Sequence, residues 1–174
     1  MDCISVDKDS LTNLTFTMFS LFLRNLFFTI LQPGLVAGLI PYLILGVDIK
    51  AAFIQPSHYN HYLGTIFFIL GFTIMLSCII GFAVKGYGTL SPADPTRRLV
   101  RSGLYKLSRN PMYLGVIMLL IGEAIFFQSI YLWLYSILIF LAFHFFILFS
   151  EEPRLRKDFG EEYGEYCNKV RRWF

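Results

Sequence analysis

Long apolar segments alternate with short polar ones along the chain. The first apolar stretch covers residues 11–47 and is interrupted by Arg24, Pro33 and Pro41. It predicts an interfacial helical lead-in followed by a transmembrane span over residues 21–45. Because proline removes a backbone donor, we expect this span to kink near Pro33. Two spans within the same stretch are the alternative.

Three further apolar segments predict three more helices, at residues 61–84, 112–127 and 130–149. The second of them opens with Pro111, a residue suited to the first helical turn. Residues 128–129 predict a tight reversal before the last span. The predicted fold class is therefore all-α: a polytopic membrane helix bundle of four transmembrane helices, with five as the alternative.

Glycines recur along the segment 61–84, at Gly64, Gly71 and Gly81. Small residues allow two membrane helices to approach closely, so these positions predict a helix contact. A raised glycine content is also usual in membrane helices in general, which is the alternative interpretation.

The charged tail from residue 151 onward carries an apolar stripe at helical spacing. The stripe consists of Leu155, Phe159, Tyr163, Tyr166, Val170 and Trp173. It predicts an amphipathic C-terminal helix that lies on the membrane face or covers the bundle, with an interruption at Gly160.

Composition agrees with a membrane protein, because 56% of the 174 residues are hydrophobic and only 16% are charged. A soluble domain has about a quarter charged residues, so this composition argues against a soluble Rossmann enzyme, a disordered segment and a secreted disulfide scaffold. Three widely spaced cysteines form no CxxC pair and predict neither a disulfide framework nor a metal site. We expect one domain over residues 1–174, with N-terminal spans in 1–84 and a cofactor-binding catalytic part in 85–174.

The net charge of +3 is unevenly distributed. The loop 85–110 and the tail 151–174 together hold 12 of the 15 basic residues. Because two spans separate them, both lie on the same side, and the positive-inside rule predicts that this side is cytoplasmic.

Two motifs flank the last helical hairpin and are expected to meet at one membrane face. The first reads GLYKLSRNPMYLG at residues 103–115, and the second reads EEPRLRKDFGEEYGEY at residues 151–166. Together they resemble the integral-membrane methyltransferase family of isoprenylcysteine carboxyl methyltransferases and phospholipid methyltransferases. The pattern of that family is Arg-His-Pro-x-Tyr, then Glu-Glu-x-x-Leu after the last span. The resemblance covers residues 86–174, about half of the chain.

The resemblance implies that S-adenosylmethionine binds at the cytoplasmic end of the bundle. The cofactor contacts that it implies come from Arg97, Arg98, Leu99, Val100, Tyr105, Asn110, Pro111, Met112, Tyr113 and Glu151. These residue types suit the cofactor, because an aromatic face stacks on adenine and a carboxylate accepts from ribose hydroxyls. Arginines or backbone N–H groups at a helix start suit its carboxylate.

Two positions depart from the family pattern. Asn110 stands where the family has histidine, so it can form hydrogen bonds but cannot act as a base near neutral pH. Ile147 stands where the eukaryotic carboxyl methyltransferases have arginine. A carboxylate substrate would therefore need Arg109 or Arg154, and Arg109 is the candidate catalytic residue.

The function we predict is S-adenosylmethionine-dependent methyl transfer to a lipid-like acceptor embedded in the membrane. An isoprenylcysteine carboxyl O-methyltransferase is favoured, and a phosphatidylethanolamine-type phospholipid N-methyltransferase is the alternative. A non-catalytic lipid-binding membrane protein is the alternative of another class. The expected partners are the membrane and the lipid-like acceptor, with no nucleic acid.

Three ionisable residues within apolar segments, Arg24, Glu123 and His144, are candidates for function because charge is costly at membrane depth. A structural role is the alternative, through an inter-helix hydrogen bond or, for Arg24, through snorkelling to the interface. Glu123 is expected roughly 18 Å above Pro111, away from the cofactor loop, which favours the structural role.

Overall fold

The computed structural model describes residues 33–46, 58–85 and 99–173, and every regular element in these ranges is helical. The elements are η1 (Leu35–Leu39), α2 (Ile40–Leu45), α4 (His58–Lys85), η2 (Gly103–Lys106), α5 (Pro111–Phe126), α6 (Ile130–Phe146), η3 (Ile147–Glu151) and α7 (Glu152–Lys169). The predicted all-α class is confirmed for this part of the chain. Arg24, Arg97, Arg98 and residues 21–32 of the first predicted span lie outside the described residues.

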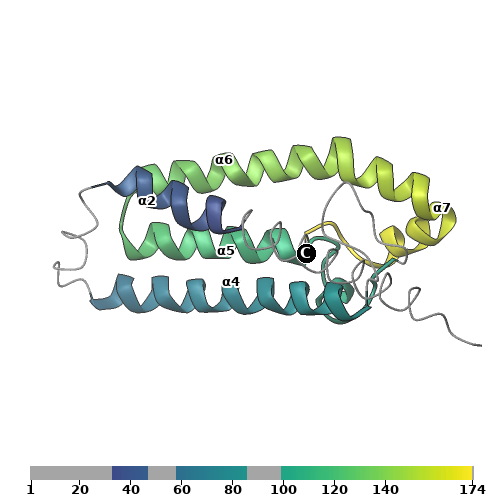
Figure 1. The fold of residues 1–174 in the computed structure, drawn as a ribbon, viewed down its shortest axis with the longest axis horizontal. Helices are drawn as coiled ribbons and strands as arrows, with labels where there is room; N and C mark the ends of the chain where they lie inside the picture. The colour runs from purple at the N-terminus through teal and green to yellow at the C-terminus, as the bar shows by residue number, and fades with distance from the viewer. Residues whose placement is uncertain (1–32, 47–57, 86–98, 174) are drawn as a thin grey trace, which may run out of the picture.

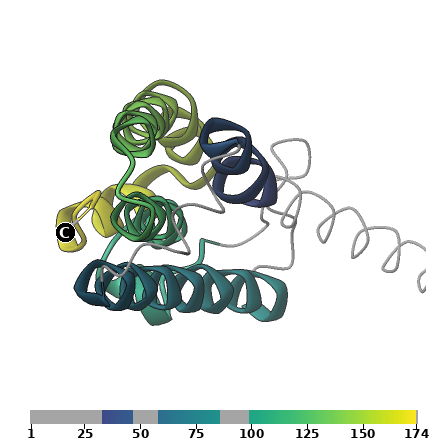
Figure 2. The ribbon, with the colours of Figure 1, turned by 90° about the vertical axis from the view of Figure 1, so that its left-hand side faces the viewer.

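The helices α4, α5 and α6 lie side by side with α5 in the middle, and α2 lies beside α5 and α6 (Figure 1). The end-on view shows the same row of three helices, with α2 against one side of it (Figure 2). One contact that holds α2 in place is a hydrogen bond of 2.9 Å from the Tyr135 hydroxyl to the Val36 carbonyl.

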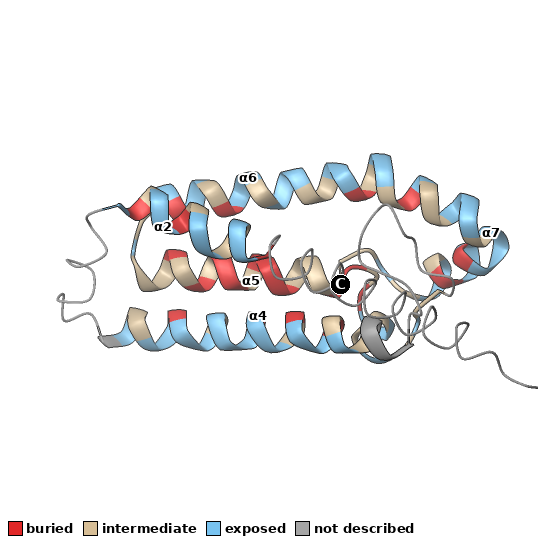
Figure 3. Cartoon of the chain, in the orientation of Figure 1, coloured by how far each residue is buried: buried red, intermediate tan, exposed pale blue. Residues whose placement is uncertain are grey.

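Burial is concentrated on the central helix α5, while the outward faces of α4 and α6 are exposed (Figure 3). Only 22% of the apolar part of α4 is buried, so its hydrophobic surface faces outward. Large exposed apolar surfaces mark contact with a membrane or a partner. Among the described residues, two helices, Tyr59–Gly81 and Ile130–Lys169, are long and apolar enough to cross a membrane, and Leu35–Leu45 and α5 are shorter. The number of four spans and the orientation stay predictions.

The helix that begins at Ile130 does not end at residue 149 but continues through η3 into α7. The element η3 is a π-helical turn, and it precedes Pro153. Because Pro153 has no N–H to donate to the preceding turn, a wider turn at this point keeps the helix continuous. The same arrangement occurs in η1, which precedes Pro41.

The predicted interruption at Gly160 is confirmed, since this residue has φ 50° inside α7. Tyr163 and Tyr166 of the predicted stripe are buried. The prediction is wrong for the last turn, because the helix ends at Lys169 and Val170 is extended, with φ −127° and ψ 131°. The carbonyl groups of Arg171 and Arg172 instead accept hydrogen bonds from the loop that precedes α5, as described below.

Glycines bring α4 and α5 into backbone contact. A Cβ atom on Gly71 would lie 2.6 Å from the Gly115 carbonyl oxygen, and one on Gly64 would lie 2.7 Å from the Gly122 carbonyl oxygen. The predicted close approach is therefore confirmed at Gly64 and Gly71. It is wrong at Gly81, where a Cβ atom would have no described neighbour within 4 Å.

We expect Gly71→Ala to destabilise the bundle, because the new methyl group meets backbone atoms that cannot move aside. Overpacking of this kind costs about 1–3 kcal/mol. Gly81→Ala is the matched control on the same helix, and it should be neutral or stabilising by about 0.5–1 kcal/mol through the lower entropy of alanine. Thermal unfolding of both variants in one detergent measures the difference, and equal midpoints would contradict the glycine contact.

Candidate functional site

The two sequence motifs meet at one end of the bundle. The loop from residue 99 to Asn110 contains the short turn η2 and leads directly into α5. Pro111 is the first residue of α5, as predicted, and Asn110 precedes it with φ −129° and ψ 51°. On the other side, η3 and α7 bring Glu151 and Glu152 to the same level.

Tyr113 and Glu151 join the two motifs directly. The Tyr113 hydroxyl donates a hydrogen bond of 2.9 Å to Glu151 Oε2. The Tyr113 ring also packs on Phe143 of α6, with 4.7 Å between ring centroids. This hydrogen bond connects two residues that are 38 positions apart in the chain, and it holds the Glu151 carboxylate against Tyr113 of α5.

A cavity of about 410 Å³ lies between the C-terminal half of α4 and the loop that leads to α5. Its lining includes Ser77, Cys78, Gly81, Val100, Gly103 and Tyr105. This size falls within the range of roughly 300–1,000 Å³ that is typical of small-molecule sites. Tyr105, which lines the cavity, lies within electrostatic range of Glu151 and Tyr113, the pair that joins the motifs.

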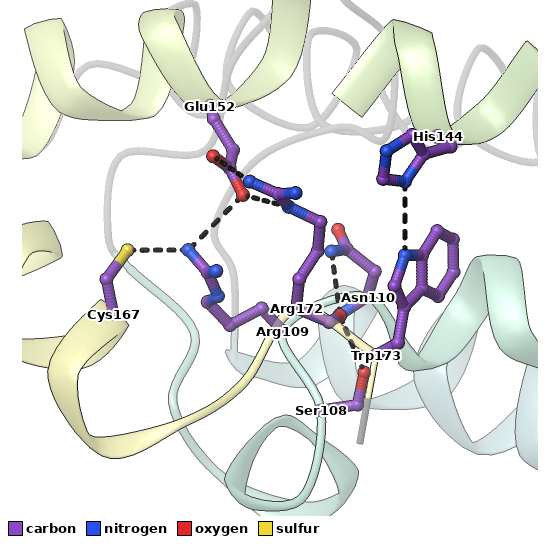
Figure 4. Close-up of polar contacts among 8 residues, drawn as sticks. All are labelled: Ser108, Arg109, Asn110, His144, Glu152, Cys167, Arg172 and Trp173. Atoms are coloured by element: carbon purple, nitrogen blue, oxygen red, sulfur yellow. Dashed lines mark hydrogen bonds and ion pairs between the residues drawn. The ribbon is translucent and has the colours of Figure 1, made fainter. Parts of the chain in front are cut away.

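A second polar cluster surrounds Glu152 (Figure 4). Arg172 donates to both carboxylate oxygens, from Nε at 2.7 Å and from Nη2 at 3.0 Å. Arg109 Nη1 lies 3.3 Å from Glu152 Oε1 and also donates to the thiol sulfur of Cys167. The side chain of Glu152 is only 7% exposed and that of Arg109 only 12%, so this is a largely buried ion cluster.

The arginines determine the ionisation of Glu152. Burial alone would raise the pKa of this carboxyl group. The hydrogen bonds from Arg172 and the charges of Arg109, Arg172 and Arg156 outweigh the burial and hold the pKa below its usual value. Glu152 is therefore an anion over the whole neutral range.

The predicted site residues divide between these two places. Val100 and Tyr105 line the cavity, and Tyr113 and Glu151 lie within electrostatic range of Tyr105. Asn110 instead donates from Nδ2 to the Arg172 carbonyl oxygen at 3.1 Å.

The remaining predicted site residues differ in burial and location. Leu99 and Met112 are half-buried, and Pro111 is buried at the start of α5. Arg109, the candidate catalytic residue, belongs to the Glu152 cluster. Arg97 and Arg98 lie outside the described residues.

Sequence reasoning missed Arg172 and treated Glu152 only as the neighbour of Glu151. The sequence did indicate a separate role for Glu152. Adjacent residues of a helix point in directions about 100° apart, so Glu151 and Glu152 cannot share one partner. No sequence signal distinguished Arg172 from Arg171 in the charged tail.

His144 and Glu123 have different surroundings from those expected. His144 Nδ1 accepts a hydrogen bond of 3.4 Å from Trp173 Nε1, so its partner is in the tail and not on α5. Glu123 Oε2 is buried and has no hydrogen-bond partner among the described residues, so the expected inter-helix bond is not formed by this atom.

The family described as phospholipid methyltransferase matches residues 59–162, and the chain therefore belongs to that family. Membership implies a methyltransferase and suggests a membrane enzyme that acts on lipids, and enzymes of this family generally use S-adenosylmethionine.

One similar protein is an uncharacterized protein from Haemophilus influenzae. It is 36% identical over 62 residues, which are 36% of this chain and 98% of that protein. No solved structure matches the chain significantly.

We expect acidification to destabilise the fold through Glu152. Because folding lowers its pKa, the stabilisation is complete above the unfolded-state pKa of about 4.3 and is lost as the pH falls through the folded-state value. Glu152→Gln should cost about 3 kcal/mol at pH 7, since it leaves the largely buried guanidinium of Arg109 and the half-buried one of Arg172 without their carboxylate. Glu161→Gln, at an exposed position of the same helix, is the control. Thermal midpoints from pH 7 to pH 3 test this, and parallel curves for the two variants would contradict it.

Proposed function

We propose that this protein transfers a methyl group from S-adenosylmethionine to a lipid-like acceptor, with the cofactor held beside Tyr105, Tyr113 and Glu151. The observation that carries the proposal is the contact between Tyr113 and Glu151, which joins the two family motifs at the edge of a cavity. Bound there, the cofactor would supply an electrophilic methyl group on a sulfonium.

The residues around the cavity fit such a cofactor. Burial raises the pKa of Tyr105, with further contributions from Cys78 and Glu151, so its phenol stays neutral and offers an aromatic face. Glu151 supplies a carboxylate acceptor for hydroxyl or amino groups, and Tyr113 orients it. Leu99 and Val100, together with Arg97, Arg98, Pro111 and Met112, are proposed to complete the contacts. The contribution of the protein is then alignment of donor and acceptor away from bulk water.

A carboxylate on a lipid-like thioether is the acceptor that we favour, as in isoprenylcysteine carboxyl methylation. Nε of Arg109 and Nε of Arg154 are buried and have no partner among the described residues. A buried unsatisfied donor is costly, and an anionic acceptor would satisfy it. Ile147, which is 1% exposed, contributes only apolar surface. A carboxylate is already ionised at neutral pH and needs no general base.

A phospholipid amine is the second candidate, and the family description favours it. Methylation of an amine releases a proton that a residue near the acceptor must take. Asn110 has no basic group for this purpose, whereas Glu151 is a half-buried carboxylate within electrostatic range of Tyr105, which lines the cavity. In this proposal, a carboxylate acceptor needs the cation of Arg109, whereas an amine acceptor needs Glu151 to take a proton.

Cofactor binding should depend on the contact between Tyr113 and Glu151. Tyr113→Phe removes the donor to a carboxylate and should raise the dissociation constant for S-adenosylmethionine about tenfold. Tyr131→Phe, on the exposed face of α6, is the matched control and should bind as the wild type does. Calorimetry in nanodiscs measures both. A folded wild-type protein that binds no cofactor would leave only the non-catalytic lipid-binding role.

The acceptor can be identified with labelled cofactor and two substrates, a prenylcysteine analogue and phosphatidylethanolamine. We expect transfer to the carboxylate, and we expect Arg109→Leu to abolish it. Arg109→Lys keeps a charge beside Glu152 but removes Nε, so it should lower kcat/KM for the carboxylate at least about tenfold with cofactor affinity unchanged. Methylation of phosphatidylethanolamine alone would sink the carboxylate assignment and establish the second candidate.

A further inference from the structure

Residues 171–173, which we call the strap, return to the loop that leads into α5. The Arg109 backbone N–H donates to the Arg171 carbonyl oxygen at 3.0 Å. The Ser108 hydroxyl and Asn110 Nδ2 both donate to the Arg172 carbonyl oxygen at 3.1 Å. Three consecutive loop residues are thus bonded to two consecutive carbonyl groups of the strap.

The side chains of the strap attach it to two other elements (Figure 4). Arg172 forms its forked pair with Glu152 at the start of α7. Trp173 packs on Phe140 of α6, with 5.2 Å between ring centroids, and donates to His144. The strap therefore fixes the loop relative to α6 and α7.

Within the loop, the Leu107 and Ser108 N–H groups donate to the Leu104 carbonyl oxygen, but the start of α5 has no side-chain cap. Asparagine before a helix usually accepts a hydrogen bond from the first-turn N–H groups, but the side chain of Asn110 forms no such cap. The side-chain amide of Asn110 points to the strap instead, and the backbone N–H of Asn110 donates to Ser108 Oγ at 3.1 Å. Residues 108–110 are thus held by these local bonds and also by a segment more than 60 residues away in the chain.

We propose that Arg172 is a positioning residue for the methyl-transfer site, which it serves by anchoring the strap on Glu152 and thereby holding the loop 108–110 at the entry to α5. This inference rests on the proposed function, because the loop leads directly to Pro111 and Tyr113. Arg172 does not itself touch the cavity. Its effect is transmitted through the Arg172 carbonyl oxygen to Asn110, and through Glu152 to Arg109.

The test compares Arg172→Ala with Arg171→Ala in the full chain in nanodiscs. The two changes remove the same charge from neighbouring residues, but the side chain of Arg171 is exposed. We expect Arg172→Ala to raise the KM for S-adenosylmethionine about tenfold or more, with a smaller change in kcat. Amide exchange at Arg109, whose N–H is bonded to the strap, should accelerate in Arg172→Ala only. Arg171→Ala should match the wild type in both measurements.

Arg172→Lys is the milder variant if Arg172→Ala does not fold, since it keeps the charge but loses the fork. An intermediate rise in KM, with faster exchange at Arg109, supports the inference. Unchanged KM in a folded variant with a lowered thermal midpoint would overturn it and leave the strap a purely structural element. Wild-type protein that binds no S-adenosylmethionine would overturn the proposed function and this inference together. Equal binding by wild type and both alanine variants would overturn this inference alone.

Discussion

Helices in a hydrocarbon environment gain little from the hydrophobic effect, so their association depends on close packing and on satisfied polar groups. Gly71 and Gly115 provide that packing here, because each would bring a Cβ atom within 3 Å of backbone on the other helix. This contact fixes α5 along α4, and α5 in turn carries the loop and Tyr113 to a defined depth. The packing of these two glycines therefore helps to set the position of the polar end of the protein.

At that polar end, two adjacent glutamates have different tasks because a helix turns about 100° per residue. Glu151 faces Tyr113 and the cavity, whereas Glu152 faces Arg109 and Arg172. The Glu152 cluster is costly to bury and is stable only while every charge in it is paired. Such a cluster can hold the loop 108–110 in one arrangement. Glu151 then remains free of the cluster and lies near Tyr105 of the cavity lining. The family motif of paired glutamates thus combines a structural residue with a proposed functional one.

The sequence predicted features that have a local cause. The start of α5 follows from Pro111, the bend at Gly160 from its freedom to adopt φ 50°, and the helix contact from Gly64 and Gly71. The failures arise where tertiary contacts decide. Val170 and Trp173 continue the helical spacing, yet the chain there becomes extended because its carbonyl groups accept from Ser108, Arg109 and Asn110. Backbone acceptors look alike at every position, so no sequence pattern could have shown this pairing.

The lengths of the helices bear on how an acceptor would reach the site. α5 has 16 residues and rises about 24 Å, whereas α4 has 28 residues and rises about 42 Å. The loop before α5 therefore lies alongside α4 and not beyond its end, and Ser77, Cys78, Ile80 and Gly81 of α4 line the cavity as a result. Residues 77–81 belong to the apolar part of α4 that is long enough to cross a membrane. In the proposed reaction, an amphiphile could then present its polar group to the cavity while its chains stay in hydrocarbon. Transfer of the whole acceptor into water, which would cost about 0.8 kcal/mol for each exposed methylene, is avoided.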